Sequence, residues 1–210
     1  MNNKKVIVFE GGDGLGKTTL AKFLIDFWPN INYTKMPSEQ GDFKFLYDYL
    51  KHHDNVFTPF ETQLLLTVSN FNVLNNYQQT KKNVTLFDRS PMSTLAYLLK
   101  TGEGNKDKIS ILIEVIKTIG DCLNFSSCAN ISFVIFQGTP FKEMASENTF
   151  EKKGVLAIDD CYNIILDILK QENKYIFAAK EKYFKINVTN KNIKYVYAEC
   201  YDFLQDILIG

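Results

Sequence analysis

Short runs of apolar residues alternate along this chain with longer segments in which apolar residues recur every three or four positions. The short runs are rich in Val, Ile and Phe and are typical of buried strands, whereas the longer segments are typical of helices that bury one face. The runs predict strands over 5–9, 31–35, 84–87, 131–136 and 184–188.

The periodic segments predict the helices that connect these strands. In the first of them, Leu20, Phe23, Leu24 and Phe27 fall on one face. Thr58 stands directly before a proline at the start of the longest helix, where an N-cap is expected. The predicted helices cover 17–27, 43–51, 60–79, 91–100, 106–123, 155–172 and 192–208.

Strands that alternate with helices indicate an α/β fold, in which a parallel sheet is covered by helices on both faces. We therefore expect a three-layer sandwich built on a five-stranded parallel sheet, with residues 1–210 forming a single domain. The stretch 137–154 has no clear periodicity and is polar from Glu143 to Lys153. It fits a mobile flap over a site and equally an ordinary loop.

Charge and composition narrow the expected partners. Lys plus Arg and Asp plus Glu each total 24, so no overall positive field draws the chain onto long nucleic acid or an anionic membrane. No apolar run has the length of a membrane span, and the run near the N-terminus is too short for a signal peptide. We expect a cytoplasmic protein with a small-molecule substrate. The four cysteines lack C-x-x-C spacing and favour free thiols over a zinc site.

The basic residues are almost all lysine, because only one of the 24 Lys and Arg residues is an arginine, Arg89. Lysine can supply a simple positive charge. A planar guanidinium is hard to replace where two parallel hydrogen bonds grip a phosphate or a carboxylate. Arg89 is therefore a candidate for such a contact, with chance retention as the alternative.

The stretch FEGGDGLGKTTL, residues 9–20, carries the most specific motif. It matches G-x-x-x-x-G-K-[ST] at every fixed position and lies between an apolar strand and an amphipathic helix, the context of a phosphate-binding loop. In such a loop, backbone N–H groups converge on phosphate oxygens, the lysine reaches the β- and γ-phosphates, and the Ser/Thr hydroxyl ligates Mg²⁺. The expected nucleotide contacts are Gly11, Gly12, Asp13, Gly14, Leu15, Gly16, Lys17, Thr18 and Thr19.

A second candidate group follows the third predicted strand, which ends in Asp88 and Arg89. A carboxylate at the carboxyl end of a parallel strand beside the phosphate loop is well placed to hold Mg²⁺, and the adjacent arginine can grip a second phosphate. The alternative is that the Asp-Arg pair caps the following helix. The phosphate loop itself leaves a GTPase, a motor ATPase and a small-molecule kinase open.

Taken together, these residues resemble the thymidylate kinases, which are P-loop nucleoside monophosphate kinases. Residues 9–19 look like the family's FEG-x-DG-x-GKTT loop, and residues 88–97 fit DR-x-x-x-S-x-x-AY at all five fixed positions. Phe150-Glu151, before the helix that carries Tyr162, is similar to the segment that closes the family's lid, placed here at about 138–154. The likeness covers nearly the whole chain and implies the P-loop kinase fold, with ATP and Mg²⁺ as cofactors.

By that resemblance, the catalytic residues would be Asp13, Lys17, Asp88 and Arg89. Asp13 would contact the acceptor's sugar hydroxyl and help to organise the transferring phosphate. Asp88 would support Mg²⁺ together with the Thr18 hydroxyl, and Arg89 would bind the acceptor monophosphate. Relatives are commonly dimers, and the apolar stripe of the long helix over 60–77 fits either the interface of a homodimer or the core.

The resemblance implies further substrate contacts, and two of them depart from the family. Tyr97 would lie against the acceptor sugar, Lys35 would add charge at its phosphate, and Thr189 sits where relatives contact the adenine of ATP. Leu66 stands where relatives stack a phenylalanine on thymine, and Asn70 where an arginine bonds the thymine carbonyl. A different pyrimidine, a modified base or a purine therefore stays open. The alternative for Asn70 is a polar surface position.

The lid also departs from the family. Relatives place an arginine either in the phosphate loop or in the lid, and this chain has Leu15 and Thr149 at those positions. Lys142, Lys152 and Lys153 remain as candidates for the same role. Because such an arginine can be worth ~10³-fold in rate, its absence indicates replacement by lysine, slow turnover or lost activity.

The predicted function is ATP-dependent phosphoryl transfer to a deoxynucleoside monophosphate, with dTMP to dTDP as the first choice. The acceptor phosphate is already a nucleophile, so positioning and charge stabilisation suffice. A nucleoside kinase would need a carboxylate base, for which Glu39 and Glu10 are within conceivable reach. Three further functions stay open, namely a kinase of a modified pyrimidine nucleotide, a kinase acting on a modified base within viral DNA, against which the zero net charge argues, and a non-catalytic nucleotide-binding protein.

Overall fold

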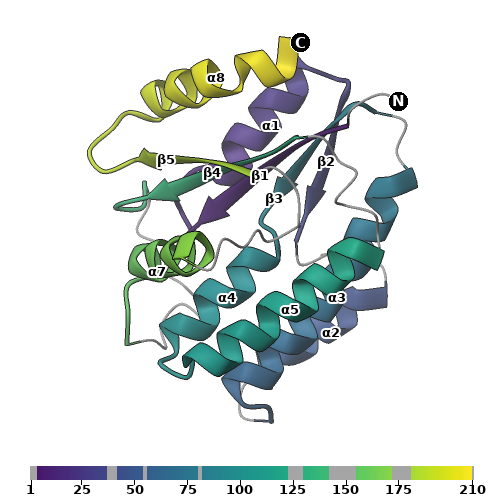
Figure 1. Cartoon of the computed structure of the whole chain (residues 1–210). Helices are drawn as coiled ribbons and strands as arrows, with labels where there is room; N and C mark the ends of the chain where they lie inside the picture. The colour runs from purple at the N-terminus through teal and green to yellow at the C-terminus, as the bar shows by residue number, and fades with distance from the viewer. Residues whose placement is uncertain are drawn as a thin grey trace.

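A parallel sheet of five strands runs through the described part of the chain (Figure 1). In this computed structural model, that part comprises residues 4–36, 42–53, 56–79, 82–122, 130–141, 155–171 and 181–209. The spatial order is β2-β3-β1-β4-β5, so β1 lies at the centre between β3 and β4. The strands are β1 (Lys5–Gly11), β2 (Ile31–Lys35), β3 (Val84–Asp88), β4 (Asn130–Gln137) and β5 (Glu181–Asn187).

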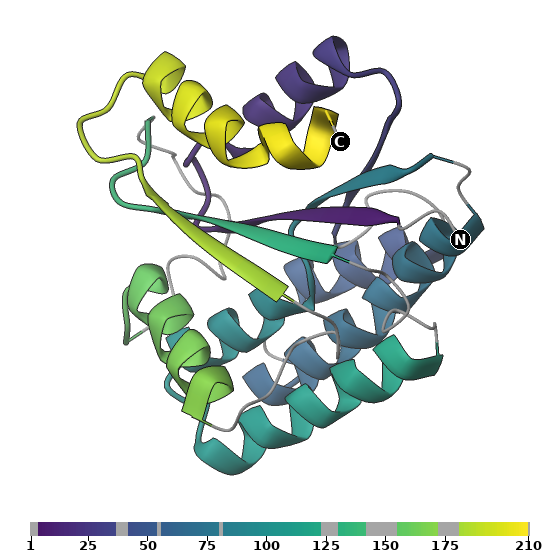
Figure 2. The same ribbon diagram turned by 45° about the horizontal axis from the view of Figure 1, so that its top comes forward.

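Helices cover both faces of this sheet, as the two views show (Figures 1 and 2). One face carries α1 (Lys17–Phe27) and α8 (Ile193–Ile209). The other carries α2 (Asp42–His52), α3 (Pro59–Gln79), α4 (Pro91–Lys100), α5 (Lys106–Cys122) and α7 (Ile158–Gln171). The predicted three-layer α/β sandwich is therefore confirmed for the described residues.

The alternation of side chains along β1 divides the core into two layers. Ile7 and Phe9 point to the face of α1 and α8, where they join Leu20 and Leu24. Val6 and Val8 belong to the cluster on the opposite face, formed with α4, α5 and α7. The same alternation sends the next side chain of that series, Glu10, toward α4 and α7.

Hydrogen bonding at the helix ends explains where several elements begin. Thr58 caps α3 as predicted, because the Glu61 N–H donates to the Thr58 hydroxyl at 3.3 Å and the Thr58 N–H donates back to the Glu61 carboxylate at 2.8 Å. The helix predicted from residue 155 begins only at Ile158. The Val155 N–H donates instead to the Lys100 carbonyl at 2.8 Å, which holds this segment against the end of α4.

Two further sequence expectations need correction. The apolar pattern predicts the fifth strand over 184–188, but β5 begins at Glu181 and ends at Asn187. On α1 only the inner half of the predicted apolar face is buried, since Phe23 is 39% and Phe27 65% exposed. Both rings contribute to an aromatic contact series with Trp28 and Tyr197 at the surface.

Three of the four cysteines lie in the described residues. Cys161 and Cys200 are buried free thiols and Cys122 is an exposed one, while Cys128 lies outside the described residues. Among the helices that the structure describes, none combines the length and the apolar character needed to cross a membrane.

Candidate active site

A cleft of about 470 Å³ opens at the carboxyl edge of the sheet. It lies where α1 leaves β1 toward one face of the sheet and α4 leaves the neighbouring strand β3 toward the other, which is where α/β sheets bind ligands. The cleft is lined by Asp13, Gly14, Leu15, Gly16, Lys17, Thr18, Thr19, Lys35, Asp88, Arg89, Phe141 and Ile193.

The backbone of the phosphate-binding loop depends on glycine. Gly11, Gly14 and Gly16 have φ values of 126°, 75° and 86°, a region that residues with a Cβ rarely adopt. At Gly11 a Cβ would also overlap the carbonyl oxygen of Phe136 on β4. The glycines therefore allow the loop to curl tightly against the sheet, directly before the N-terminus of α1.

Lys17, at the first position of α1, lies buried under this loop. Its Nζ donates hydrogen bonds to the carbonyl oxygens of Gly11, at 3.0 Å, and of Gly12. Burial lowers the pKa of the Lys17 ammonium to about 8, and repulsion from Arg89 acts in the same direction. An anion in the cleft would offset the free-energy cost of burying the charged ammonium. The position of Lys17 therefore suits phosphate binding.

Thr18 and Asp88 bring a hydroxyl and a carboxylate together beside the loop. The Thr18 Oγ1 donates to Asp88 Oδ2 at 2.6 Å, and the Tyr33 hydroxyl donates to the same oxygen at 3.2 Å. Both donors come from elements adjacent to β3, so the Asp88 carboxylate is oriented from two sides. Mg²⁺ accepts few protein ligands and prefers hard oxygen donors, so the pair formed by Thr18 and Asp88 fits this ion.

Arg89 is held in position by its backbone and by contacts of its guanidinium. Its φ of 76° is unusual for a residue with a Cβ, and its N–H donates to the Phe9 carbonyl at 2.8 Å. The guanidinium forms an ion pair with Asp13 and lies 5.5 Å from the ring centroid of Tyr97. Burial opposes its charge, but the attraction of Tyr97 and Asp13 raises the pKa of Arg89 well above its ordinary value.

The alternative role of Asp88 and Arg89, as a cap of the following helix, is not what the structure contains. Ser90 is the N-cap of α4, and its Oγ accepts the Met92 N–H at 3.1 Å. Asp88 and Arg89 face the cleft instead. Lys35, at the end of β2, lines the same cleft and adds a third basic side chain to it.

Six expected ligand contacts lie outside the cleft lining: Gly11 and Gly12 at the start of the loop, and Leu66, Asn70, Tyr97 and Thr189. Leu66 and Asn70 are buried on α3, with exposed fractions of 8% and 2%. Tyr97 touches the site through Arg89. The Thr189 Oγ1 accepts the Thr139 N–H at 3.0 Å, so this hydroxyl joins the end of β5 to the start of the expected lid. The part of that lid from 142 to 154 lies outside the described residues.

Two residues that sequence reasoning missed form an apolar wall beside the loop. The Phe141 N–H donates to the Gly14 carbonyl at 3.1 Å. A Cβ at Gly16 would lie 3.2 Å from the Phe141 ring and 3.5 Å from the Ile193 side chain. Phe141 follows a proline in an aperiodic stretch and Ile193 starts α8, so neither carries a motif that could have identified it.

Glu10, which the sequence presents only as a distant candidate base, anchors a buried polar cluster next to Arg89. Ser90 Oγ donates to Glu10 Oε1 at 2.6 Å, and Ser93 Oγ and the Tyr162 hydroxyl donate to Oε2 at 2.6 and 2.8 Å. Burial raises the pKa of Glu10, while the hydrogen bonds from Ser90 and Ser93 oppose the shift. The donors are 80 to 152 residues away along the chain, which is why sequence spacing could not reveal the cluster.

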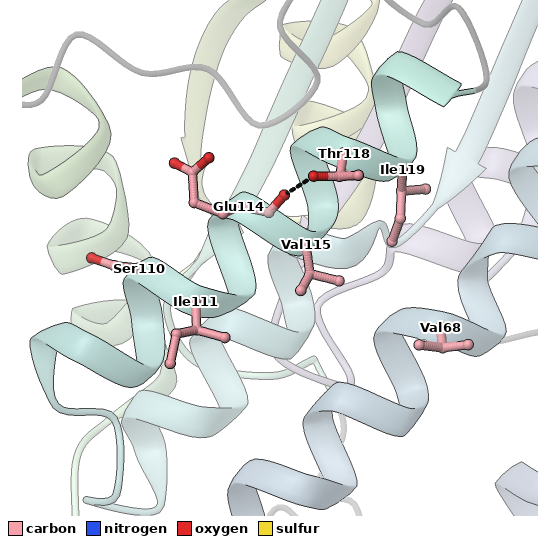
Figure 3. A pocket seen from close by; sticks show the side chains of 7 residues that line it. All are labelled: Val68, Ser110, Ile111, Glu114, Val115, Thr118 and Ile119. Carbon is pink, nitrogen blue, oxygen red and sulfur yellow. Dashed lines mark hydrogen bonds between the residues drawn. The ribbon is translucent and has the colours of Figure 1, made fainter.

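A second, larger hollow of about 750 Å³ lies between α3 and α5 and has a different character. Figure 3 shows Val115 and Ile119 of α5 and Val68 of α3 pointing toward the space between these helices. Its remaining lining residues are Ser110, Ile111, Glu114 and Thr118. Since this lining is mainly aliphatic and contains no basic side chain, it does not fit a phosphorylated ligand.

Comparison with known proteins supports the fold. No model of a known protein family matches the sequence, and no curated protein is significantly similar to it in sequence. A solved structure of thymidylate kinase from Candida albicans is similar at 18% identity and a TM-score of 0.66, over 97% of this chain and 92% of that one. Thymidylate kinase from Ehrlichia chaffeensis is similar at 17% identity and a TM-score of 0.62, over 96% of this chain and 99% of that one. The chain therefore has the thymidylate kinase fold over nearly its whole length.

Proposed function

We propose that this protein transfers the γ-phosphoryl group of ATP to a nucleoside monophosphate. The observation that carries the proposal is that one cleft holds Lys17, under a phosphate-binding loop, and Arg89, paired with Asp13 of the same loop. These are two cationic side chains on different elements, and such a pair suits the binding of a donor phosphate and an acceptor phosphate side by side. We further propose that residues 1–210 act as one domain with a lid at about 138–154, and that the reaction is cytoplasmic.

The donor side of the cleft would bind ATP. The loop N–H groups and the N-terminus of α1 would hold the phosphates, with Lys17 at the β- and γ-phosphates. The apolar wall of Phe141 and Ile193 offers a surface for the flat face of a nucleobase. When bound, Mg²⁺ would neutralise charge on the phosphates, and Thr18 and Asp88 would hold it.

The acceptor side would bind a phosphate monoester. Arg89 and Lys35 supply positive charge there, and Asp13 holds the guanidinium in place and can accept a sugar hydroxyl. A phosphate acceptor needs no general base. Glu10 is fully buried and accepts three hydroxyl hydrogen bonds, so it does not present itself to the cleft as the base of a nucleoside kinase. Glu39 lies outside the described residues.

We propose that the acceptor carries a pyrimidine base, with dTMP as the first choice. Among the described residues, Asn70 Oδ1 is a buried acceptor without a hydrogen-bond partner. Such an atom costs free energy unless a donor reaches it, and the N–H group of a pyrimidine base is a donor of suitable size. Asn70 stands one turn after Thr67, whose hydroxyl lies 2.9 Å from that of Thr94 on α4. This places polar groups from both helices close together.

The charge that relatives supply with an arginine would have to come from elsewhere in this chain. Leu15 is buried against the core and carries no charge. Thr149, Lys142, Lys152 and Lys153 lie outside the described residues. We propose that one of these lysines takes the role, at a lower turnover, because a lysine lacks the forked geometry of a guanidinium.

We also propose that two copies of the chain associate through the hollow between α3 and α5. Much of the apolar stripe of α3 packs inside the protein. Leu66 and Val73 are buried, and Phe60 and Leu64 pack against the core. The exposed Val68 then joins α5 in the aliphatic hollow of Figure 3. Covering such a surface in a second copy would remove apolar area from water.

The proposed reaction is tested by ADP release from ATP and Mg²⁺ across a panel of nucleosides and nucleoside monophosphates. We expect release that depends on a pyrimidine monophosphate and disappears in Lys17→Ala. Release with nucleosides alone would assign a nucleoside kinase instead. Nucleotide binding without release across the whole panel would favour a non-catalytic protein.

A further inference from the structure

The Glu10 carboxylate lies where the sequence pattern of β1 would place an apolar side chain. Val6 and Val8, on the same face of the strand, belong to the hydrophobic cluster under α4, α5 and α7. Burying a carboxylate in such a layer costs free energy even when it is hydrogen-bonded. The proposed reaction gives Glu10 no contact with either substrate, so another role must explain its presence.

A chain of hydrogen bonds runs from Glu10 to the guanidinium of Arg89. Arg89 Nη1 lies 3.4 Å from Ser93 Oγ and can only donate, so this is a long hydrogen bond in which Ser93 accepts. The Ser93 hydroxyl is then free to donate its own proton to Glu10 Oε2, at 2.6 Å. The direction of each bond therefore follows from the chemistry of the groups, with Glu10 as the final acceptor.

Tyr162 connects the same carboxylate to α7. Its hydroxyl lies 2.8 Å from Glu10 Oε2 and 3.2 Å from Ser93 Oγ. Burial, reinforced by the negative charge of Glu10, raises the pKa of Tyr162 well above its ordinary value, so the phenol keeps the proton that it donates. The first turn of α7 is in turn joined to the end of β4, because the Gly138 N–H donates to the Asp159 carboxylate at 2.7 Å.

We propose that Glu10, Ser93 and Tyr162 form a positioning relay that fixes the orientation of the Arg89 guanidinium and joins it to α7. That Arg89 binds a phosphate is part of the proposed function. The relay that orients Arg89 does not depend on that function. Ser90 shares the carboxylate but caps α4, and it has no place in the chain of contacts to Arg89.

The single arginine of the chain makes the relay directly measurable. In protein labelled with ¹⁵N-arginine, one side-chain Nε–H signal must come from Arg89, without any assignment. We expect Tyr162→Phe and Ser93→Ala to move this signal and to speed rotation of the guanidinium by about 2- to 10-fold, the size of one lost hydrogen bond. Ser93→Thr, which keeps the hydroxyl, should restore the wild-type signal.

Tyr183→Phe is the matched control, because it removes a tyrosine hydroxyl that bonds to Glu181 on β5, away from the relay. An Arg89 signal that is the same in Tyr162→Phe, Ser93→Ala and wild type would overturn the proposal. So would an equal change in Tyr183→Phe. Tyr162→Phe keeps the ring and the packing of α7, so this variant tests the relay even if Ser93→Ala fails to fold.

Titration of the same samples with dTMP and with ATP separates the relay from the proposed function. We expect the relay variants to weaken dTMP binding while ATP binding stays at its wild-type strength. If Arg89 responds to the variants but dTMP and other nucleoside monophosphates never shift its signal in wild type, the relay stands and the proposed function fails. If monophosphates shift the Arg89 signal but the variants do not, the relay is wrong while the proposed acceptor site stands.

Discussion

The Arg89 guanidinium and the Asp13 carboxylate form an ion pair across the cleft, so the phosphate-binding loop itself holds the chain's one arginine. Both side chains are largely buried, at 12% and 24% exposure. Lys17 lines the same cleft as this pair. A phosphate that binds Arg89 must therefore share or displace the Asp13 contact, which sets the acceptor phosphate close to the loop that holds the donor.

In Arg89→Lys we expect the affinity for a nucleoside monophosphate to fall by about 10- to 100-fold, because the charge remains but the forked pair of hydrogen bonds is lost. ATP affinity should change by less than about threefold, since Lys17 and the N–H groups of the loop remain in place. Calorimetric titration with each ligand checks both values. Equal losses for the two ligands would argue that Arg89 supports the whole site instead of the acceptor alone.

We expect Lys17 to take up a proton when ATP binds at alkaline pH. With its pKa lowered to about 8, the free protein has lost most of this proton at about pH 9, and the phosphates of ATP restore the charged form. At about pH 6.5 the ammonium is already charged in the free protein, so no uptake by Lys17 is expected there. Apparent ATP affinity should accordingly weaken as the pH rises through 8.

The uptake is measured by titration calorimetry without Mg²⁺, in two buffers of different ionisation enthalpy. Lys17→Met is the control, and its binding heat should not depend on the buffer at about pH 9 beyond what other groups contribute. Buffer-independent heats in wild type at that pH would contradict a lowered pKa at Lys17.

Substitution of the first two glycines of the loop, Gly11 and Gly12, should destabilise the protein to different extents. Gly11→Ala should lower the free energy of unfolding by about 3 kcal/mol and abolish ATP binding, because its Cβ would overlap the Phe136 backbone at a positive φ. In Gly12→Ala the new Cβ would lie 3.0 Å from the Cγ2 methyl group of Ile158, a side-chain atom instead of backbone, and the substitution should cost less, about 1 to 2 kcal/mol. Urea unfolding of both variants checks the order, and a similar loss in each would contradict it.

Residues near one another in sequence were predictable, and residues that meet only in the fold were not. The phosphate loop and the pair Asp88-Arg89 lie at strand ends, so the run of apolar residues before each one predicted its place at the cleft. The cluster around Glu10 joins hydroxyl groups from α4 and α7, and no periodicity links them. The late start of α7 had the same cause, since it depends on a backbone bond to Lys100.

The depth at which a side chain is buried also depends on tertiary packing. The family resemblance implies that Leu66 and Asn70 reach the base, and the structure buries both side chains on α3, outside the residues that line the cleft. The wall of Phe141 and Ile193 depends on how the segments after β4 and β5 approach the loop. Such approaches are set by tertiary contacts, which the pattern of apolar residues does not specify.

Asn70→Leu separates a base-reading role from a structural one. Because the buried Oδ1 has no partner among the described residues, replacing the amide with an apolar group of similar size should raise the free energy of unfolding by about 1 kcal/mol. Discrimination between nucleobases should fall by about 5- to 100-fold, as a ligand hydrogen bond is lost. Denaturation and a monophosphate panel measure the two effects. A less stable protein with unchanged base preference would mean that Asn70 serves the fold.

If two copies associate through the hollow between α3 and α5, a charged residue placed in this hollow should separate them. Ile111→Glu places a carboxylate on a lining residue that is 50% exposed, and should convert a dimer to monomers in light scattering without loss of secondary structure. Ile164→Glu on α7, at 37% exposure and away from the hollow, is the matched control and should leave the dimer intact. A monomeric wild type would exclude this interface.

Phosphoryl transfer is tested most directly by following the phosphoryl group itself. The protein is incubated with ATP labelled in the γ-phosphate, Mg²⁺ and dTMP, and the products are separated by chromatography. We predict label in dTDP, formed in wild type, reduced in Arg89→Lys and absent in Lys17→Ala. Label that appears only in inorganic phosphate, or only in a monophosphate made from a nucleoside, would contradict transfer to a nucleoside monophosphate.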